Sequence, residues 1–145
     1  ISYKFKTNLL ILGEGSNRDM LTKFIYSLNL EERVFMPGFL KNPFFYISRA
    51  KIFVHSSFAE GLPNSLLQAV MLNKYVISTD CDYGPKEIIN GSGYGKLVPI
   101  GDYNMMAKMI EQALLHTPST KKNYDFIEKF NIEKIINEYE ILFSQ

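Results

Sequence analysis

The sequence predicts an α/β protein with a parallel sheet of about five strands flanked by helices. Short apolar runs of strand length alternate with segments of helical periodicity, which is the pattern of a parallel sheet with helical crossovers. Glycine and proline follow several of these runs and mark the turns. The chain has 145 residues, 46% of them hydrophobic and 21% charged, a composition typical of one globular domain. We therefore expect a single domain over residues 1–145.

In the first half of the chain, three strands are predicted, over residues 9–12, 33–36 and 51–55. A helix over 17–28 follows the first strand, with Ser16 or Asn17 as its N-cap. Pro37 and Gly38 are predicted to close the second strand. Asn42 is positioned to cap a short helix with Pro43 at its first position, where a missing N–H costs least. The third strand leads through a turn into a helix over 63–72.

In the second half, two further strands are predicted, over 75–79 and 96–99. The preceding helix is expected to end near Asn73, because Asn tolerates the left-handed conformation of a helix C-terminus. A single helical turn is predicted over 85–89. Asp102 is expected to cap a helix that runs to residue 115. Residues 131–145 form an amphipathic C-terminal helix in this prediction.

Composition excludes several classes of function. A net charge of +1 provides no field to attract nucleic acid or anionic lipid. No apolar stretch approaches the ~20 residues that a membrane span requires. The single cysteine, Cys81, excludes an internal disulfide and is expected to be buried. His55 and His116 lack metal-ligand spacing, and we interpret Asp80 and Asp82 as loop-capping residues, so no metal is expected.

The segment SSFAEGLPNSLLQA, which begins at Ser56, is the most informative part of the sequence. A strand ends there, a turn carries Glu60 and Gly61, and a helix begins near Pro63. The carboxylate accepts hydrogen bonds from sugar hydroxyls, and helix N-terminal N–H groups attract phosphate oxygens. The corner therefore matches a phosphate-bearing, polyhydroxylated ligand at the carboxyl end of a strand. Position alone leaves the alternative that Glu60 only stabilises the positive end of the helix.

Motifs along most of the chain resemble the retaining nucleotide-sugar glycosyltransferases of family four. The resemblance rests on Ser57, on EGLPNSLLQA from Glu60 and on YVISTDCDYGPKEII from Tyr75. The flanking runs LLILGEG, VFMPGF, AKIFVHSS and GKLVP also resemble their counterparts in the family. The resemblance implies a Rossmann-like domain, the C-terminal lobe of the two-lobed GT-B fold, which binds the sugar donor.

The resemblance also implies that parts of the enzyme lie outside this chain. In the family, the lobe's first strand and helix precede the LLILGEG strand and carry the Arg and Lys that neutralise the donor diphosphate. The acceptor-binding N-terminal lobe precedes them. We therefore expect a donor-binding fragment of a larger enzyme, whose isolated form binds nucleotide weakly and transfers no sugar.

The resemblance assigns roles residue by residue. Glu60 would hydrogen-bond hydroxyls of the transferred sugar and is the catalytic candidate, while N–H groups near Gly61 would face sugar or phosphate oxygens. The turn at Gly13 would line the nucleotide pocket, although it lacks the third glycine of a dinucleotide fingerprint. For Gly38 and Phe39, nucleobase contact and a simple turn with a packed aromatic remain equal alternatives. The predicted donor-binding residues are Gly13, Gly15, Gly38, Phe39, Ser57, Glu60, Gly61, Leu62, Pro63, Asn64, Leu67 and Gln68.

Gln68 is the one departure from the motif, because the family carries there a second Glu that binds the ribose hydroxyls of the nucleotide. Gln keeps a carbonyl acceptor but loses the charge, and charge-assisted hydrogen bonds are the stronger kind. We expect donor affinity to be about 1 kcal/mol weaker than with Glu. A tolerated variant with full activity and a weakened or altered donor site both remain open.

The resemblance implies a retaining hexosyltransferase of EC class 2.4. It would move a hexose or N-acetylhexosamine from a nucleoside diphosphate, expected to be UDP, to a glycan or lipid-linked acceptor in bacterial surface polysaccharide synthesis. No cofactor is expected, and no nucleic acid partner. The expected location is the cytoplasm, with peripheral association of the full-length protein at the cytoplasmic membrane face. The alternative is a non-catalytic nucleotide-binding or assembly module, supported only by Gln68.

Overall fold

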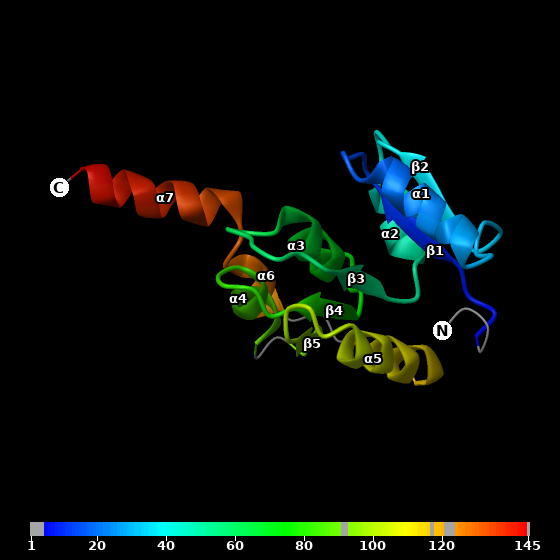
Figure 1. Ribbon diagram of the computed structural model, residues 1–145. Coiled ribbons are helices and arrows are strands. Elements are labelled where there is room, and N and C mark those ends of the chain that lie inside the picture. The colour runs from blue at the N-terminus through cyan, green and yellow to red at the C-terminus, as the bar shows by residue number, and fades with distance from the viewer. Residues whose placement is uncertain (1–4, 91–92, 117, 121–123, 145) are drawn as a thin grey trace. The chain divides into compact units, whose positions relative to one another are not determined.

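The structure is a computed structural model that describes residues 5–90, 93–116, 118–120 and 124–144. The chain forms two compact units, Ile1–Arg49 and Ala50–Gln145 (Figure 1). Both units contain parallel strands connected by helices. The predicted α/β class is therefore confirmed.

Unit 1 is a pair of parallel strands with two helices. Its elements are β1 (Leu9–Leu12), α1 (Arg18–Ser27), β2 (Val34–Gly38) and α2 (Phe44–Arg49). Leu9 lies opposite Val34, and a register shift brings Leu12 opposite Gly38. The second strand therefore continues through Pro37, two residues beyond its predicted end. Proline is tolerated there because, in the described part of the chain, β2 pairs with β1 alone and needs no N–H donor on its other edge.

Unit 2 is built around a three-stranded parallel sheet in the order β3-β4-β5. Its elements are β3 (Phe53–His55), α3 (Asn64–Met71), β4 (Val76–Thr79), α4 (Pro85–Ile89), β5 (Gly95–Val98), α5 (Tyr103–Leu115), α6 (Tyr124–Glu128) and α7 (Ile132–Phe143). Helix α6 was not predicted. The C-terminal helix follows its N-cap Asn131 as expected, and Gln145 at its predicted end lies outside the described residues.

The core of unit 2 lies on both faces of β4, whose four residues are all buried. On one face, Ile77 and Val98 pack with Ala113 of α5. On the other, α3 contacts β3 and β4 and buries Leu66, Ala69 and Val70. Figure 1 shows α3 and α5 on either side of this sheet. A strand with both faces covered is the expected centre of a parallel sheet.

Two local expectations about the core are confirmed. Asn73 follows α3 with a φ of 59°, the left-handed conformation predicted for the end of that helix. Cys81 is buried with 1% of its surface exposed.

Burial raises the pKa of the Tyr75 phenol above its ordinary value of 10.0, so this side chain is neutral in the core at physiological pH.

The sequence predicted one sheet of about five strands, and hydrogen bonds join the five strands as a pair and a triplet. The strands themselves and their parallel pairing agree with the prediction. Which strands become neighbours depends on tertiary placement, and the apolar pattern of each strand carries no record of it.

Within the described ranges, no helix combines the length and apolar character needed to cross a bilayer.

Candidate functional site

The predicted corner of unit 2 lies between the carboxyl end of β3 and the start of α3. β3 ends at His55, and α3 begins at Asn64 after Pro63, whose extended backbone (φ −74°, ψ 93°) forms the N-cap. The first N–H groups of a helix have no carbonyl partner inside it and carry the positive end of its dipole. Glu60 lies in the turn that leads to this helix end, with 26% of its side chain exposed.

A histidine holds the carboxylate of Glu60 in place. Nε2 of His55 lies 3.1 Å from Oε1 of Glu60, and Nδ1 lies 3.1 Å from Oγ of Ser78. The hydroxyl of Ser57 lies 3.3 Å from the same Nε2. His55 is buried, with 8% of its surface exposed. The carboxylate at the corner is therefore tied to the end of β3 and, through the ring, to β4.

The turn at Glu60 also contacts the loop after β4. Gly84 has a φ of 65°, and a Cβ at this position would overlap the side chain of Pro63 and the carbonyl oxygen of Gly61. Only glycine satisfies both the positive φ and this close approach. The two longest motifs of the sequence, which begin at Glu60 and Tyr75, thus meet at the same corner.

The remaining predicted residues of unit 2 lie around this corner. Gly61, Leu62 and Asn64 are exposed, and Leu67 and Gln68 are half-buried on α3. A hydrogen bond joins this turn to β4, because Thr79 Oγ1 donates to the Ser57 carbonyl at 2.5 Å. All eight predicted residues from Ser57 to Gln68 therefore belong to one turn and the helix that follows it.

Asp80, at the end of β4, forms an ion pair with a residue of α4. Its Oδ2 lies 3.3 Å from Lys86 Nζ, and its other oxygen, Oδ1, is buried without a hydrogen-bond partner in the structure. Asp82 is exposed. Within the described part of the chain, no three His, Cys, Asp or Glu side chains gather as ligands for a metal ion.

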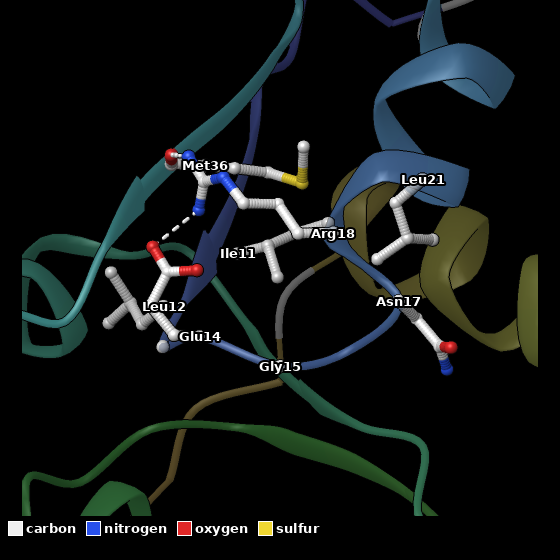
Figure 2. Close-up of a pocket in the computed structure, with 9 residues that line it drawn as sticks. Ile11, Leu12, Glu14, Gly15, Asn17, Arg18, Leu21 and Met36 are labelled. Carbon is white, nitrogen blue, oxygen red and sulfur yellow. Dashed lines mark hydrogen bonds and ion pairs between the residues drawn. The ribbon is translucent and has the colours of Figure 1, made fainter.

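The predicted residues of unit 1 gather at the carboxyl ends of β1 and β2. Gly13 donates its N–H to the Gly38 carbonyl at 3.0 Å, and Gly38, at a φ of 83°, leaves room for the Glu14 carboxylate. Gly13 and Gly15 line a pocket of about 210 Å³ next to the start of α1 (Figure 2). Phe39 has 80% of its surface exposed, and its predicted contact with the nucleobase stays a prediction.

Arg18 supplies the positive charge of this pocket. Figure 2 shows its guanidinium directed at Glu14, with Nη1 at 2.6 Å from Oε1. Nη2 donates to the Met36 carbonyl at 2.7 Å. The arginine therefore links the start of α1 to the turn after β1 and to β2.

Sequence reasoning missed the roles of His55 and Arg18. His55 was considered only as a metal ligand, although it lies five residues before Glu60 at the carboxyl end of a strand. Arg18 is the first residue after the N-cap of α1, where a cation follows a glycine-containing turn. His55 is the last residue of a predicted strand and Arg18 follows a predicted strand through a short turn, and that placement was the available signal.

Comparison with known proteins identifies the family. The family model of the glycosyl transferases group 1 matches residues 3–130. An N-acetylgalactosamine-N,N'-diacetylbacillosaminyl-diphospho-undecaprenol 4-α-N-acetylgalactosaminyltransferase of Campylobacter jejuni is 33% identical over 121 residues, 83% of this chain and 33% of that protein. A poly(ribitol-phosphate) α-N-acetylglucosaminyltransferase of Staphylococcus aureus is 32% identical over 139 residues, 92% of this chain and 28% of that protein.

A solved structure gives the same result for the fold. A TarM mutant of S. aureus, in complex with fondaparinux, α-GlcNAc-glycerol and UDP, matches 95% of this chain and 29% of its own chain, with a TM-score of 0.81 and 28% sequence identity. The chain thus spans a third or less of the length of the curated relatives described above.

Proposed function

Because the chain belongs to the group 1 glycosyl transferases, we propose that it binds the nucleotide-sugar donor of a retaining hexosyltransferase. The donor would be a UDP-linked hexose or N-acetylhexosamine, and the acceptor a glycan or lipid-linked glycan of the bacterial cell surface. The two curated relatives support this choice, since their names specify transfer of N-acetylgalactosamine to a diphospho-undecaprenol-linked sugar and of N-acetylglucosamine to poly(ribitol-phosphate). UDP is present in the TarM complex.

The observation that carries the proposal is the corner around Glu60. A carboxylate is held half-buried at the carboxyl end of a strand, next to the N-terminus of α3. The carboxylate accepts hydrogen bonds from sugar hydroxyls, and the N–H groups of Asn64 and Ser65 attract the diphosphate. Both parts of a nucleotide sugar therefore find matching groups within one turn of unit 2.

In the proposed reaction, the sugar leaves its nucleoside diphosphate through a transition state with oxocarbenium character. Negative charge develops on the leaving phosphate, and N–H groups at the start of α3 stabilise it. Preorganised donors aimed at developing charge are a large contribution to catalysis. Glu60 orients the sugar, and the predicted residues Gly13, Gly15, Gly38 and Phe39 are proposed to contact the nucleotide.

The activity of the whole protein requires more than this chain, because the chain spans a third or less of its curated relatives. We expect the isolated chain to bind nucleotide weakly and to transfer no sugar. We place the whole protein in the cytoplasm, where nucleotide sugars are made, with peripheral contact to the membrane face when its acceptor is lipid-linked. Turnover by the isolated chain would contradict the first of these expectations.

The proposal is tested by calorimetric titration of the chain with UDP, GDP, ADP and UDP-N-acetylglucosamine. We expect UDP to bind better than GDP or ADP. The substitution Glu60→Ala should weaken binding of UDP-N-acetylglucosamine about tenfold, which corresponds to the loss of a hydrogen bond to a charged group. Glu31→Ala, at an exposed position of unit 1, is the control.

Three results would count against the proposal. Equal affinity for all three nucleotides would remove the UDP assignment. Binding that is insensitive to Glu60→Ala would place the ligand elsewhere. Absence of binding by every nucleotide would favour the alternative of an assembly module with a degenerate donor site at Gln68.

A further inference from the structure

We propose that His55 is a positioning residue for Glu60, and that it leaves one carboxylate oxygen free to receive a single sugar hydroxyl. The imidazole Nε2 lies 3.1 Å from Oε1 of Glu60. A hydrogen bond there occupies Oε1 and directs the second oxygen, Oε2, away from the ring. The ligand part of this inference rests on the proposed function, whereas the link between the two side chains does not.

The ring itself is held at its opposite side. Nδ1 of His55 lies 3.1 Å from the hydroxyl of Ser78, a residue of β4 with no exposed surface. The same hydroxyl lies 3.1 Å from the Thr79 carbonyl. Because one nitrogen is anchored on the central strand and the ring is buried, the position of the other nitrogen is determined.

The geometry also determines where the proton lies. If Glu60 is a carboxylate and Nε2 were unprotonated, two lone pairs would face each other at 3.1 Å, which is repulsive. Nε2 therefore carries a proton and donates it to Oε1, whether Ser78 donates to Nδ1 or accepts from it. The hydroxyl of Ser57, 3.3 Å from Nε2, accepts from the same N–H or remains available to the ligand.

This arrangement has a consequence for donor binding. Glu60 lies in a turn whose neighbours Gly61 and Leu62 are exposed, so the turn alone leaves the carboxylate free to rotate. A bond from His55 removes this freedom before the ligand arrives, and preorganisation of this kind increases affinity. His55 is thus expected to affect recognition of the sugar and not of the nucleoside.

The first experiment measures the link in the absence of ligand. The chain has two histidines, so the variant His116→Ala leaves the ring nitrogens of His55 as the only histidine signals in a 15N-edited NMR spectrum. We expect a protonated Nε2 whose chemical shift changes when Glu60→Gln is added. An unprotonated Nε2, or an Nε2 chemical shift that does not change when Glu60→Gln is added, would overturn the proposal.

The second experiment uses a matched pair of substitutions. The amide of Gln reaches the position of Nε2, whereas the amide of Asn reaches only that of Nδ1. His55→Gln therefore preserves the bond to Glu60, and His55→Asn preserves the bond to Ser78 alone. If His55 acted only by filling space or by joining β3 to β4, His55→Asn would be tolerated at least as well as His55→Gln.

The readout is the gain in affinity that the sugar adds, given by the ratio of the dissociation constants for UDP and UDP-N-acetylglucosamine. We expect His55→Asn to reduce this ratio about tenfold and to leave UDP affinity unchanged. His55→Gln should keep the ratio within about twofold of the natural chain. Equal loss in both variants, or loss of UDP affinity itself, would refute a positioning role.

The two experiments separate this inference from the proposed function. If the natural chain binds no nucleotide, the proposed function fails, and the NMR measurement still decides whether His55 holds Glu60. If nucleotides bind and the NMR signals of His55 do not change when Glu60→Gln is added, the proposed function stands and the inference fails.

Discussion

Position 68 carries an amide where the resemblance implies a carboxylate, on a half-buried site of α3. We predict that Gln68→Glu increases affinity for UDP about fivefold, or about 1 kcal/mol, because a charged acceptor strengthens hydrogen bonds to the ribose hydroxyls. Calorimetric titration measures this gain. Gln112→Glu, which adds the same charge on the exposed surface of α5, should leave the affinity unchanged. An unaltered or lower affinity in Gln68→Glu would place the ribose away from this side chain.

Gly84 is the residue on which the contact between the two long motifs depends. We predict that Gly84→Ala destabilises the chain by about 3 kcal/mol, since it adds left-handed strain and a collision with Pro63 and Gly61. Gly93 is the matched control, because it has a φ of 74° but no atom within 4 Å of a Cβ at that position. Gly93→Ala should cost only about 1 kcal/mol. Urea denaturation of both variants makes the comparison, and equal costs would mean that the close approach is unimportant.

At the scale of the element, helix N-caps show how one side chain determines where a helix begins. Asp102 accepts a hydrogen bond from the Met105 N–H at 2.8 Å and starts α5, as its position in the sequence predicts. Asn17 precedes α1 as its N-cap, but its side chain makes no capping bond. Two residues that both favour the N-cap position in the sequence thus contribute differently to their helices.

This difference gives a prediction for stability. Asp102→Ala should reduce the free energy of unfolding by about 1 kcal/mol, because it removes a capping bond from α5. Asn17→Ala should change it by less than about 0.5 kcal/mol, since no side-chain bond is lost. Chemical denaturation followed by circular dichroism measures both. A larger cost at Asn17 than at Asp102 would contradict the assignment of the caps.

At the scale of the whole molecule, burial is distributed unevenly along the chain. All four residues of β4 are buried, whereas β1, of the same length, has two exposed and two half-buried residues. In the described part of unit 1, the buried residues are Gly38 and Ile47. Most of the buried apolar surface that stabilises the structure therefore lies in unit 2.

We predict that the amides of β4 exchange with solvent about tenfold more slowly, or slower still, than those of β1. Local opening costs less where little apolar surface is buried, and β4 is also paired with strands on both edges, whereas β1 pairs with β2 alone in the described part of the chain. Hydrogen exchange followed by NMR measures both strands in one sample. Equal protection of β1 and β4 would show that the chain opens as a single cooperative unit.

Local structure was largely predictable from the sequence. The strand Leu9–Leu12 and the helical turn Pro85–Ile89 were predicted with the bounds that the structure gives them, because apolar runs and proline act over a few residues. Prediction was poorer at Pro37, where the strand continues along an edge that is unpaired in the described part of the chain, and at α6, whose five residues are too few to show a clear helical periodicity. The corner residues from Ser57 to Gln68 were predicted from the resemblance of their motif to the family, and this motif can be recognised in the sequence because its residues lie close together in the chain.

The sequence by itself determined the α/β class, the strands, the helices other than α6, and the carboxylate at a strand end beside a helix. These follow from residue type and from contacts between near neighbours in the chain. Only the tertiary structure decided that five strands form a pair and a triplet, that Gly84 packs on Gly61, and that His55 joins Glu60 to Ser78. Residues 55 and 78 lie on different strands, and their distance depends on how β3 and β4 pair. No local pattern records that pairing, because it is the packing of the whole unit that selects it.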